Sequence, residues 1–271
     1  MATYLQNQQK VRRKRSISMV LVFGGTTEGK KVMECLERRQ QSFIYSTKTK
    51  VEVEESAYMK YHSGALDQEQ MDAFIHENKI SMIIDAAHPF AEILHQTIAS
   101  IALKNELPVI RFGRKPIQLE GENGILWAED YKDAETLLFD RFQGKKLLAL
   151  TGVQTIEKFE KWWKQHPSIF RILPRESSKE IAEKTGFPKE DLILSMPNQE
   201  QELEESLIKE KGIDVVMTKE SGASGFLQTK IDASQTCGIP IIIIREPKIP
   251  ASFQVVYTVQ ELENKLEQNG F

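Results

Sequence analysis

The sequence lacks the features that mark membrane proteins and proteins that bind long polyanions. No apolar run among its 271 residues approaches the roughly 20 residues that a membrane-spanning helix needs. Thirty-six basic and thirty-nine acidic side chains give a net charge of -3, so we expect neither a nucleic-acid nor a membrane partner. The basic residues within 1–17 precede an apolar run too short for a signal peptide, and this segment is predicted to be a disordered tail.

Cysteine is scarce, and several catalytic motifs are missing. Cys35 and Cys237 lie far apart in apolar segments, which indicates buried thiols of a reducing compartment, the cytoplasm, rather than a disulfide. The sequence has no spaced cluster of cysteine and histidine, no P-loop and no G-x-S-x-G turn. We therefore expect no resident metal.

The sequence does contain short β-branched apolar runs that alternate with amphipathic segments almost from end to end. This alternation is typical of βαβ units around a parallel sheet, so the predicted fold class is α/β. Strands are expected at Met19–Phe23, Phe43–Ser46, Ile80–Asp85, Val109–Phe112, Lys146–Leu150, Ile169–Leu173, Leu192–Met196, Asp214–Thr218 and Pro240–Arg245. Because "VLVFGGTTEGKKV" and "LLALTGVQTIEKF" share one order of strand, small-residue turn and helix, we expect two Rossmann-like, doubly wound parallel-sheet domains, 18–141 and 142–271. One larger α/β domain is the alternative.

The turn "GGTTEG" follows the first predicted strand and opens a helix near Thr27. Its glycines lack the G-x-G-x-x-G spacing of the dinucleotide fingerprint. Gly24 and Gly25 nevertheless allow close approach of a ligand to the backbone, and Thr26 and Thr27 offer hydroxyl groups beside the free N–H groups of a helix start. The alternative is a tight corner between strand and helix, capped by threonine.

The second predicted strand ends in Ser46, Thr47 and Lys48. Folds that bind NAD commonly place an acidic residue there for the ribose hydroxyls, whereas a 2′-phosphate favours basic and hydroxyl groups. If a dinucleotide binds the glycine turn, NADPH fits this strand end better than NADH.

The stretch "IIDAAHPFA" places Asp85 and His88 just beyond a buried strand. An imidazole there titrates in the range that suits proton transfer or binding of a carboxylate. Alternatively, Asp85 caps the turn and His88 forms a hydrogen bond with the backbone.

Basic residues recur where predicted strands end: Arg111, Arg114, Arg175, Lys219 and Lys230. Single charges on loops are usually solvated, but several at the rims of two sheets suit a substrate with many carboxylates.

These turns resemble those of a known family, the precorrin-6A reductases of vitamin B12 biosynthesis, which include the cobalt-precorrin-6A reductases. "VLVFGGTTEG" is similar to the amino-terminal motif of the family, "DAAHPFA" to its D-A-T-H-P-F-A motif and "RFGRKP" to its R-x-x-R-P segment. "LLALTG", "LPR" and "MTKESGASGFLQTKIDASQTCGIPIIIIREP" extend the resemblance into the second half. Three departures are Ala87 in place of threonine, Lys115 between Arg114 and Pro116, and Ser224 in place of a glycine.

The resemblance implies a reductase that takes hydride from NADPH, with NADH as the other possibility, and saturates one carbon–carbon double bond of a tetrapyrrole macrocycle. The macrocycle carries many carboxylates and would bring any metal with it. The ligands would lie in a cleft between the two domains. The implied site comprises cofactor contacts at Gly24–Glu28 and Ser46–Lys48, catalytic roles for Asp85 and His88, and substrate contacts at Arg111, Arg114, Thr151, Arg175, Lys219, Ser221, Gly222 and Lys230.

Two other classes of function remain open at this point. The first is a reductase of a smaller acidic substrate that uses the same dinucleotide. The second is a regulator of the same fold that binds a ligand without catalysis. The sequence leaves the oligomeric state open.

Overall fold

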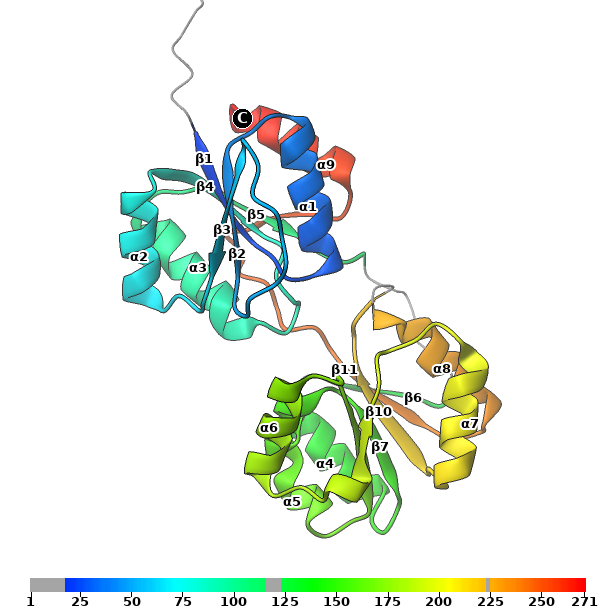
Figure 1. The fold of residues 1–271 in the computed structure, drawn as a ribbon. Coiled ribbons are helices and arrows are strands. Elements are labelled where there is room, and N and C mark those ends of the chain that lie inside the picture. The colour runs from blue at the N-terminus through cyan, green and yellow to red at the C-terminus, as the bar shows by residue number, and fades with distance from the viewer. Residues whose placement is uncertain (1–17, 116–122, 223–224) are drawn as a thin grey trace, which may run out of the picture. The chain divides into compact units, whose positions relative to one another are not determined.

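The computed structural model describes residues 18–115, 123–222 and 225–271, and its contacts divide the chain into two units (Figure 1). The first unit holds the residues up to Gly113 together with Lys248–Phe271, and the second holds Arg114–Pro247. The basic tail 1–17 and the substitution at Ser224 lie outside the described residues. Each unit is built on one sheet of six parallel strands, which confirms the α/β class.

The first sheet has the strand order β3-β2-β1-β4-β5-β12, which is that of dinucleotide-binding Rossmann folds. Its strands are β1 (Met19–Phe23), β2 (Phe43–Thr47), β3 (Met59–Ser63), β4 (Ile80–Asp85), β5 (Val109–Phe112) and β12 (Gln254–Val256). The helices of this unit are α1 (Thr27–Arg38), α2 (Gln68–Glu77), α3 (Glu92–Lys104) and α9 (Val259–Gln268).

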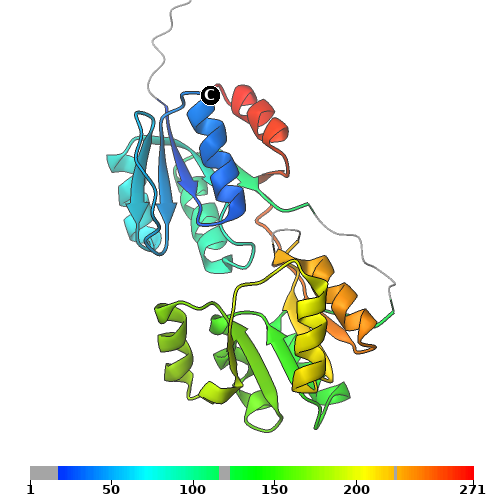
Figure 2. The same ribbon diagram turned by 45° about the vertical axis from the view of Figure 1, so that its right-hand side comes forward.

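Both faces of the first sheet are buried. Successive side chains of a strand point to opposite faces, so Val20 and Val22 pack with α1 and α9, whereas Leu21 and Phe23 pack with α2 and α3. Figures 1 and 2 show α1 and α9 side by side over one face of this sheet. A strand that is apolar on both faces reads as a continuous run, and this is why "MVLVF" signalled a parallel sheet.

The second sheet has the order β6-β11-β10-β7-β8-β9. Its strands are β6 (Ile125–Ala128), β7 (Leu147–Leu150), β8 (Ser168–Ile172), β9 (Leu192–Leu194), β10 (Val215–Lys219) and β11 (Ile241–Ile244). The α-helices are α4 (Tyr131–Arg141), α5 (Glu160–Trp163), α6 (Glu176–Thr185), α7 (Gln201–Lys211) and α8 (Leu227–Thr236), and 3-10 turns occur at η1 (Val153–Thr155), η2 (Glu157–Phe159) and η3 (Lys189–Asp191). Helices α7 and α8 cover one face, and α4, α5 and α6 cover the other (Figure 1).

The division between the units differs from the expected boundary near residue 142. Strand β6 pairs with β11, so β6 and α4 belong to the second unit. Strand β12 pairs with β5 and returns the carboxyl-terminal helix α9 to the first unit. In each case an edge strand gains backbone hydrogen bonds from a partner remote in sequence.

Among the described helices, none is long and apolar enough to cross a membrane.

Candidate functional site

The strand order creates a topological switch point at the carboxyl edge of the first sheet. Strand β1 lies between β2 and β4, and ligands of open α/β sheets bind outside such a point. The turns that follow β1 and β4 meet there, because the Thr26 hydroxyl donates a hydrogen bond to the Ala86 carbonyl with 2.7 Å between the oxygens. The two expected segments, Gly24–Glu28 and Asp85–His88, are thus neighbours in the first unit.

The glycine turn opens α1. Thr26 is the N-cap residue, and its side-chain oxygen accepts a hydrogen bond from the Gly29 N–H at 3.0 Å. Gly25 has a φ of +90°, which a residue with a β-carbon adopts only under strain. Gly25 and Thr27 are exposed, whereas Glu28 is buried. The turn therefore combines the threonine cap of a strand-to-helix corner with a helix start that can face an anion.

Tyr45 on β2, which the sequence analysis missed, supports this turn. Its hydroxyl oxygen accepts a hydrogen bond from the Gly25 N–H at 2.8 Å. A β-carbon at Gly24 would lie 2.3 Å from the Tyr45 ring, so glycine is required there by close packing. Burial raises the pKa of Tyr45, which keeps the phenol neutral. Because Tyr45 accepts the Gly25 N–H and Thr26 accepts the Gly29 N–H, neither of these two groups is available to a ligand.

The end of β2 differs in detail from the expected phosphate contact. Ser46 Oγ lies 3.0 Å from His62 Nδ1, and Thr47 Oγ1 lies 2.7 Å from the hydroxyl oxygen of Tyr61. Both side chains are buried, whereas Lys48 is exposed. The two hydroxyl groups thus hold the end of β2 in place, and Lys48 is the member of the set that can reach a ligand.

Asp85 lies at the centre of a buried charged cluster. One carboxylate oxygen is 2.9 Å from Arg111 Nη1, and the other is 2.6 Å from Nδ1 of His95 on α3. Asp85 Oδ1 also accepts a hydrogen bond from the Ala87 N–H, and Arg111 Nη1 donates to the Ala87 carbonyl at 3.0 Å. The three charged side chains are at most 2% exposed. The cluster fixes the turn after β4, and Arg111 is a core residue rather than part of an exposed basic rim.

His95 completes this cluster on the side of α3. His95 Nε2 lies 3.0 Å from the Pro89 carbonyl, which can only accept a hydrogen bond, so Nε2 carries a proton. His95 Nδ1 faces the Asp85 carboxylate at 2.6 Å. Although burial opposes ionisation, the His95 contact and the Arg111 charge hold the pKa of Asp85 below its usual range. One buried carboxylate therefore lies between the Arg111 guanidinium and the His95 imidazole. His95 was not predicted from the sequence, because it lies in the apolar face of a helix.

His88 lies on the turn that this cluster holds. It is exposed, and its Nδ1 accepts a hydrogen bond from the Phe90 N–H at 3.2 Å. This bond is the backbone contact of the alternative interpretation. In the neutral imidazole it also selects the tautomer with the proton on Nε2. His88 can thus present an N–H donor at the switch point.

The second sheet repeats the switch point between β7 and β10. After β7, Thr151 Oγ1 lies 2.6 Å from Thr155 Oγ1, which in turn donates to the Gly152 carbonyl at 2.7 Å. Thr151 is buried, so its hydroxyl stabilises the turn of "TGVQT". Lys219 ends β10 on the other side of the same switch point.

The turn after β10 contains two more expected residues, Ser221 and Gly222. Arg114 Nη1 donates to the Ser221 carbonyl at 2.5 Å, and Gly222 has a φ of +60°. Added at Gly222, a β-carbon would lie 3.2 Å from the Arg114 side chain. Arg114, Ser221 and Gly222 are therefore brought together within the second unit.

Lys230 on α8 lies beneath this turn. Its ammonium group is 2.8 Å from the Gly225 carbonyl and 3.4 Å from Thr218 Oγ1. Burial, with a smaller effect of the Arg171 charge, lowers the pKa of Lys230 to about 8. Arg171 itself forms a buried ion pair with Glu204, with 2.6 Å between Nη1 and the carboxylate. Lys230 is 5% exposed and so holds the loop from inside.

Lys219 and Arg175 have different surroundings. The Lys219 ammonium lies 5.6 Å from the centre of the Tyr131 ring, and burial followed by the charge of Lys158 lowers its pKa to about 8. Arg175 is exposed at the start of α6. Lys158 and Tyr131 were not singled out by the sequence, because each lies in a segment whose charge pattern is ordinary for a solvated surface.

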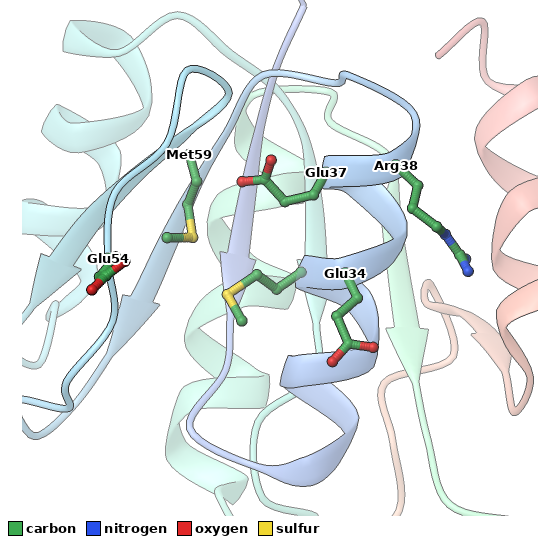
Figure 3. A pocket seen from close by; sticks show the side chains of 6 residues that line it. Glu34, Glu37, Arg38, Glu54 and Met59 are labelled. Carbon is green, nitrogen blue, oxygen red and sulfur yellow. The ribbon is translucent and has the colours of Figure 1, made fainter.

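A separate pocket of about 450 Å³ lies in the first unit and is lined by Met33, Glu34, Glu37, Arg38, Glu54 and Met59 (Figure 3). Its α1 residues lie toward the carboxyl end of that helix, whereas the glycine turn lies at the amino end. Arg38 points away from the pocket in Figure 3 and pairs with Glu263 at 3.4 Å. The remaining carboxylates disfavour a phosphate or a carboxylate there, so this pocket is not part of the candidate site.

Comparison with known proteins agrees with this geometry. The family described as "Precorrin-6x reductase CbiJ/CobK" matches residues 19–267. A cobalt-precorrin-6A reductase of Priestia megaterium is 28% identical over 251 residues, which cover 90% of this chain and 95% of the relative. The corresponding relative of Synechocystis sp. is also 28% identical, over 86% of this chain and 90% of its own.

A solved structure described as CobK precorrin-6A reductase has the same fold. It superposes with a TM-score of 0.76 at 19% identity and covers 93% of this chain and 98% of its own. This likeness confirms the two-domain α/β architecture. The family model spans most of the sequence, well beyond any single motif. The chain therefore belongs to the precorrin-6x reductase family, whose members are oxidoreductases that reduce a carbon–carbon double bond of the precorrin-6A macrocycle in cobalamin biosynthesis.

Proposed function

We propose that this protein is an NADPH-dependent reductase of precorrin-6A in its cobalt-containing form. The observation that carries the proposal is the turn Gly24–Thr26, which opens α1 at the switch point of a sheet with the strand order of dinucleotide-binding folds. The relatives named cobalt-precorrin-6A reductases support the choice of the cobalt form.

The residues at this turn fit a dinucleotide. The exposed start of α1 offers N–H groups and the Thr27 hydroxyl to a diphosphate, and glycine at 24 and 25 keeps side chains out of the way. When bound, the reduced nicotinamide supplies the hydride. For the 2′-phosphate of NADPH, the exposed Lys48 is the contact, while the buried Ser46 and Thr47 hold the strand end beneath it.

His88 is assigned to the macrocycle rather than to the cofactor. Because its Nδ1 accepts the Phe90 N–H, its Nε2–H is the group that would donate to a carboxylate or pass a proton to the carbon skeleton. Asp85, Arg111 and His95 position this imidazole by fixing the turn, and none of them is exposed. Their role is thus to hold His88 in place.

The second unit supplies cations for the carboxylates of the substrate. Arg175 is exposed and Lys219 half-buried beside the turns that end β8 and β10. Arg114 and Lys230 shape the loop after β10 from within, together with Ser221 and Gly222. Binding of a flexible polycarboxylate depends on such fixed positions more than on net charge.

The free cysteines, Cys35 and Cys237, suit a reducing compartment, and we place the enzyme in the cytoplasm.

The direct test is an anaerobic assay of reduced-nicotinamide absorbance with cobalt-precorrin-6A and with metal-free precorrin-6A. We expect oxidation of NADPH that depends on the macrocycle and is faster than with NADH. Gly24→Ala should raise the Kd for NADPH by about tenfold or more, because the new β-carbon would displace Tyr45 from the turn. No oxidation of either cofactor in the presence of either macrocycle would contradict the proposal.

A further inference from the structure

Two tyrosines lie side by side on neighbouring strands of the first sheet. Tyr45 on β2 and Tyr61 on β3 are paired in register, so their side chains lie on the same face of the sheet. Tyr45 belongs to the apolar core that α1 covers, and Tyr61 packs against that core. The Tyr45 hydroxyl supports the glycine turn through the Gly25 N–H. The Tyr61 hydroxyl has an equivalent role in another loop, as its contacts show.

The Tyr61 hydroxyl contacts the loop that follows β2. It lies 2.7 Å from Thr47 Oγ1 and accepts a hydrogen bond from the Val51 N–H at 2.9 Å. The Thr47 hydroxyl has a single proton, which it donates to the Thr49 carbonyl at 2.8 Å. Tyr61 is therefore the donor to Thr47, and its hydroxyl both donates and accepts a hydrogen bond in this loop.

Lys48 lies between the residues that these bonds fix. The bond from Thr47 to the Thr49 carbonyl spans it, and the Thr47 carbonyl accepts the Gly64 N–H at 2.9 Å. Lys48 is exposed, whereas Thr47 is buried. Residues 48–51 belong to no helix or strand. Their backbone is held instead by these hydrogen bonds, on both sides of the exposed lysine.

This loop begins beside the glycine turn. A β-carbon at Gly25 would lie 3.7 Å from Thr47 Cγ2, which is ordinary van der Waals contact. In folds of this class the end of β2 is where a protein distinguishes the 2′-phosphate of a dinucleotide from a free ribose hydroxyl. A lysine on a flexible loop loses conformational entropy when it binds a phosphate, so a loop that is already ordered binds more tightly.

We infer that Tyr61 is a positioning residue for the 2′-phosphate of NADPH, because its hydroxyl holds the loop from which Lys48 binds that phosphate. Tyr61 acts through Lys48 and does not itself contact the phosphate. The inference rests on the proposed function, since it takes NADPH as the hydride donor. Loss of the Tyr61 hydroxyl should therefore weaken binding of NADPH and spare NADH, which lacks the 2′-phosphate.

The test compares Tyr61→Phe with Tyr58→Phe. Both variants keep the ring and remove one hydroxyl, but Tyr58 is held through its backbone N–H, which donates to Ser56 Oγ at 3.0 Å. The Kd values for NADPH and NADH are measured by titration of reduced-nicotinamide fluorescence. We expect Tyr61→Phe to raise the Kd for NADPH about fivefold, the effect of one lost hydrogen bond, and the Kd for NADH less than about twofold. Tyr58→Phe should change neither.

Two further measurements test the positioning role itself. Amide hydrogen exchange of the protein without cofactor should be faster at Val51 in Tyr61→Phe and unchanged in Tyr58→Phe. Because Tyr61 acts through Lys48, the double variant Tyr61→Phe/Lys48→Gln should bind NADPH no more weakly than Lys48→Gln alone. Additive losses of NADPH affinity in the double variant would overturn the assignment.

The outcomes separate this inference from the proposed function. If the wild type and Tyr61→Phe preferred NADPH to the same degree, the proposed function would stand and the role of Tyr61 would be overturned. An equal loss of affinity for NADPH and NADH would also overturn it, because a general structural defect affects both cofactors. If the wild type bound both cofactors equally while Val51 exchange rose in Tyr61→Phe, the loop contact would stand, but the NADPH preference and the phosphate role of Tyr61 would be refuted.

Discussion

Asp85→Asn should be among the most destabilising substitutions in the first unit. The change keeps the volume and the acceptor for the Ala87 N–H but removes the anion between Arg111 and His95. These side chains are at most 2% exposed, so water cannot replace the lost charge. Breaking a buried pair by removing one partner costs about 3–5 kcal/mol, a large part of the roughly 5–15 kcal/mol that stabilises an ordinary domain.

The distribution of tryptophan allows this loss to be located. All three tryptophans, Trp127, Trp162 and Trp163, lie in the second unit. In urea unfolding, tryptophan fluorescence therefore reports the second unit, while far-UV circular dichroism reports both. We expect Asp85→Asn to move the dichroism transition to lower urea and to leave the fluorescence transition in place.

Glu204→Gln is the matched control, because Glu204 is the anion of the buried pair with Arg171 in the second unit. It should move the fluorescence transition by a similar free energy. The reasoning would be refuted if Asp85→Asn cost less than about 1 kcal/mol, or if the double variant Asp85→Asn/Arg111→Met recovered none of the loss.

The pH dependence has a definite sign. The pKa of Asp85 is held low in the folded state, so its carboxylate stabilises the fold above the unfolded pKa of about 3.9. That stabilisation is lost as the pH falls through the folded pKa. The difference between the wild type and Asp85→Asn should therefore be full near pH 7 and shrink below about pH 4. A difference that stays constant down to acid unfolding would contradict this account.

Three further predictions concern cofactor binding, the His88 imidazole and the pKa values of Lys219 and Lys230. Lys48→Gln should weaken NADPH binding about tenfold or more and spare NADH, with Lys50→Gln as the control on the same exposed loop; an equal loss for both cofactors would refute the contact. His88→Asn should lower turnover about a hundredfold with little change in NADPH binding, and full activity would exclude a proton-transfer role. Lys219 and Lys230 have pKa values lowered to about 8, so the unfolded state binds more protons between about pH 8 and 10.4, and the stability of the second unit should rise over that range. Lys230→Met should reduce the rise measured by tryptophan fluorescence, and a flat wild-type profile would contradict the assignment.

Strands that are buried on both faces were the easiest part of the fold to predict. Every strand expected from the sequence is present, as in Met19–Phe23 and Val109–Phe112, because a continuous apolar run is sufficient to mark a central parallel strand. Strands β3, β6 and β12 were not predicted. Each is an edge strand; β3, for example, reads "MKYHS", with polar residues that ordinary loops share.

The site was predictable at the level of turns and less so at the level of side chains. The glycine turn and "DAAHPFA" were located correctly at a strand end, because parallel strands present their carboxyl ends at one edge of a sheet. The sequence could not show that Arg111 turns inward to Asp85, since an arginine near the end of a strand is expected to be exposed when its partners are unknown. It also gave no reason to link Tyr131 with Lys158 and Lys219, which come together only through packing.

The sequence by itself determined the class of fold, the order of strand, turn and helix, and the position of the strand-end turns, because these depend on periodicity, glycine and capping within short segments. Only the tertiary structure decided which edge strand belongs to which sheet and which charges are buried as pairs. Both depend on contacts between residues far apart in the chain. Strand β12 joins β5 from the far end of the sequence, and Asp85 becomes the centre of a buried charged cluster only when Arg111 and His95 surround it.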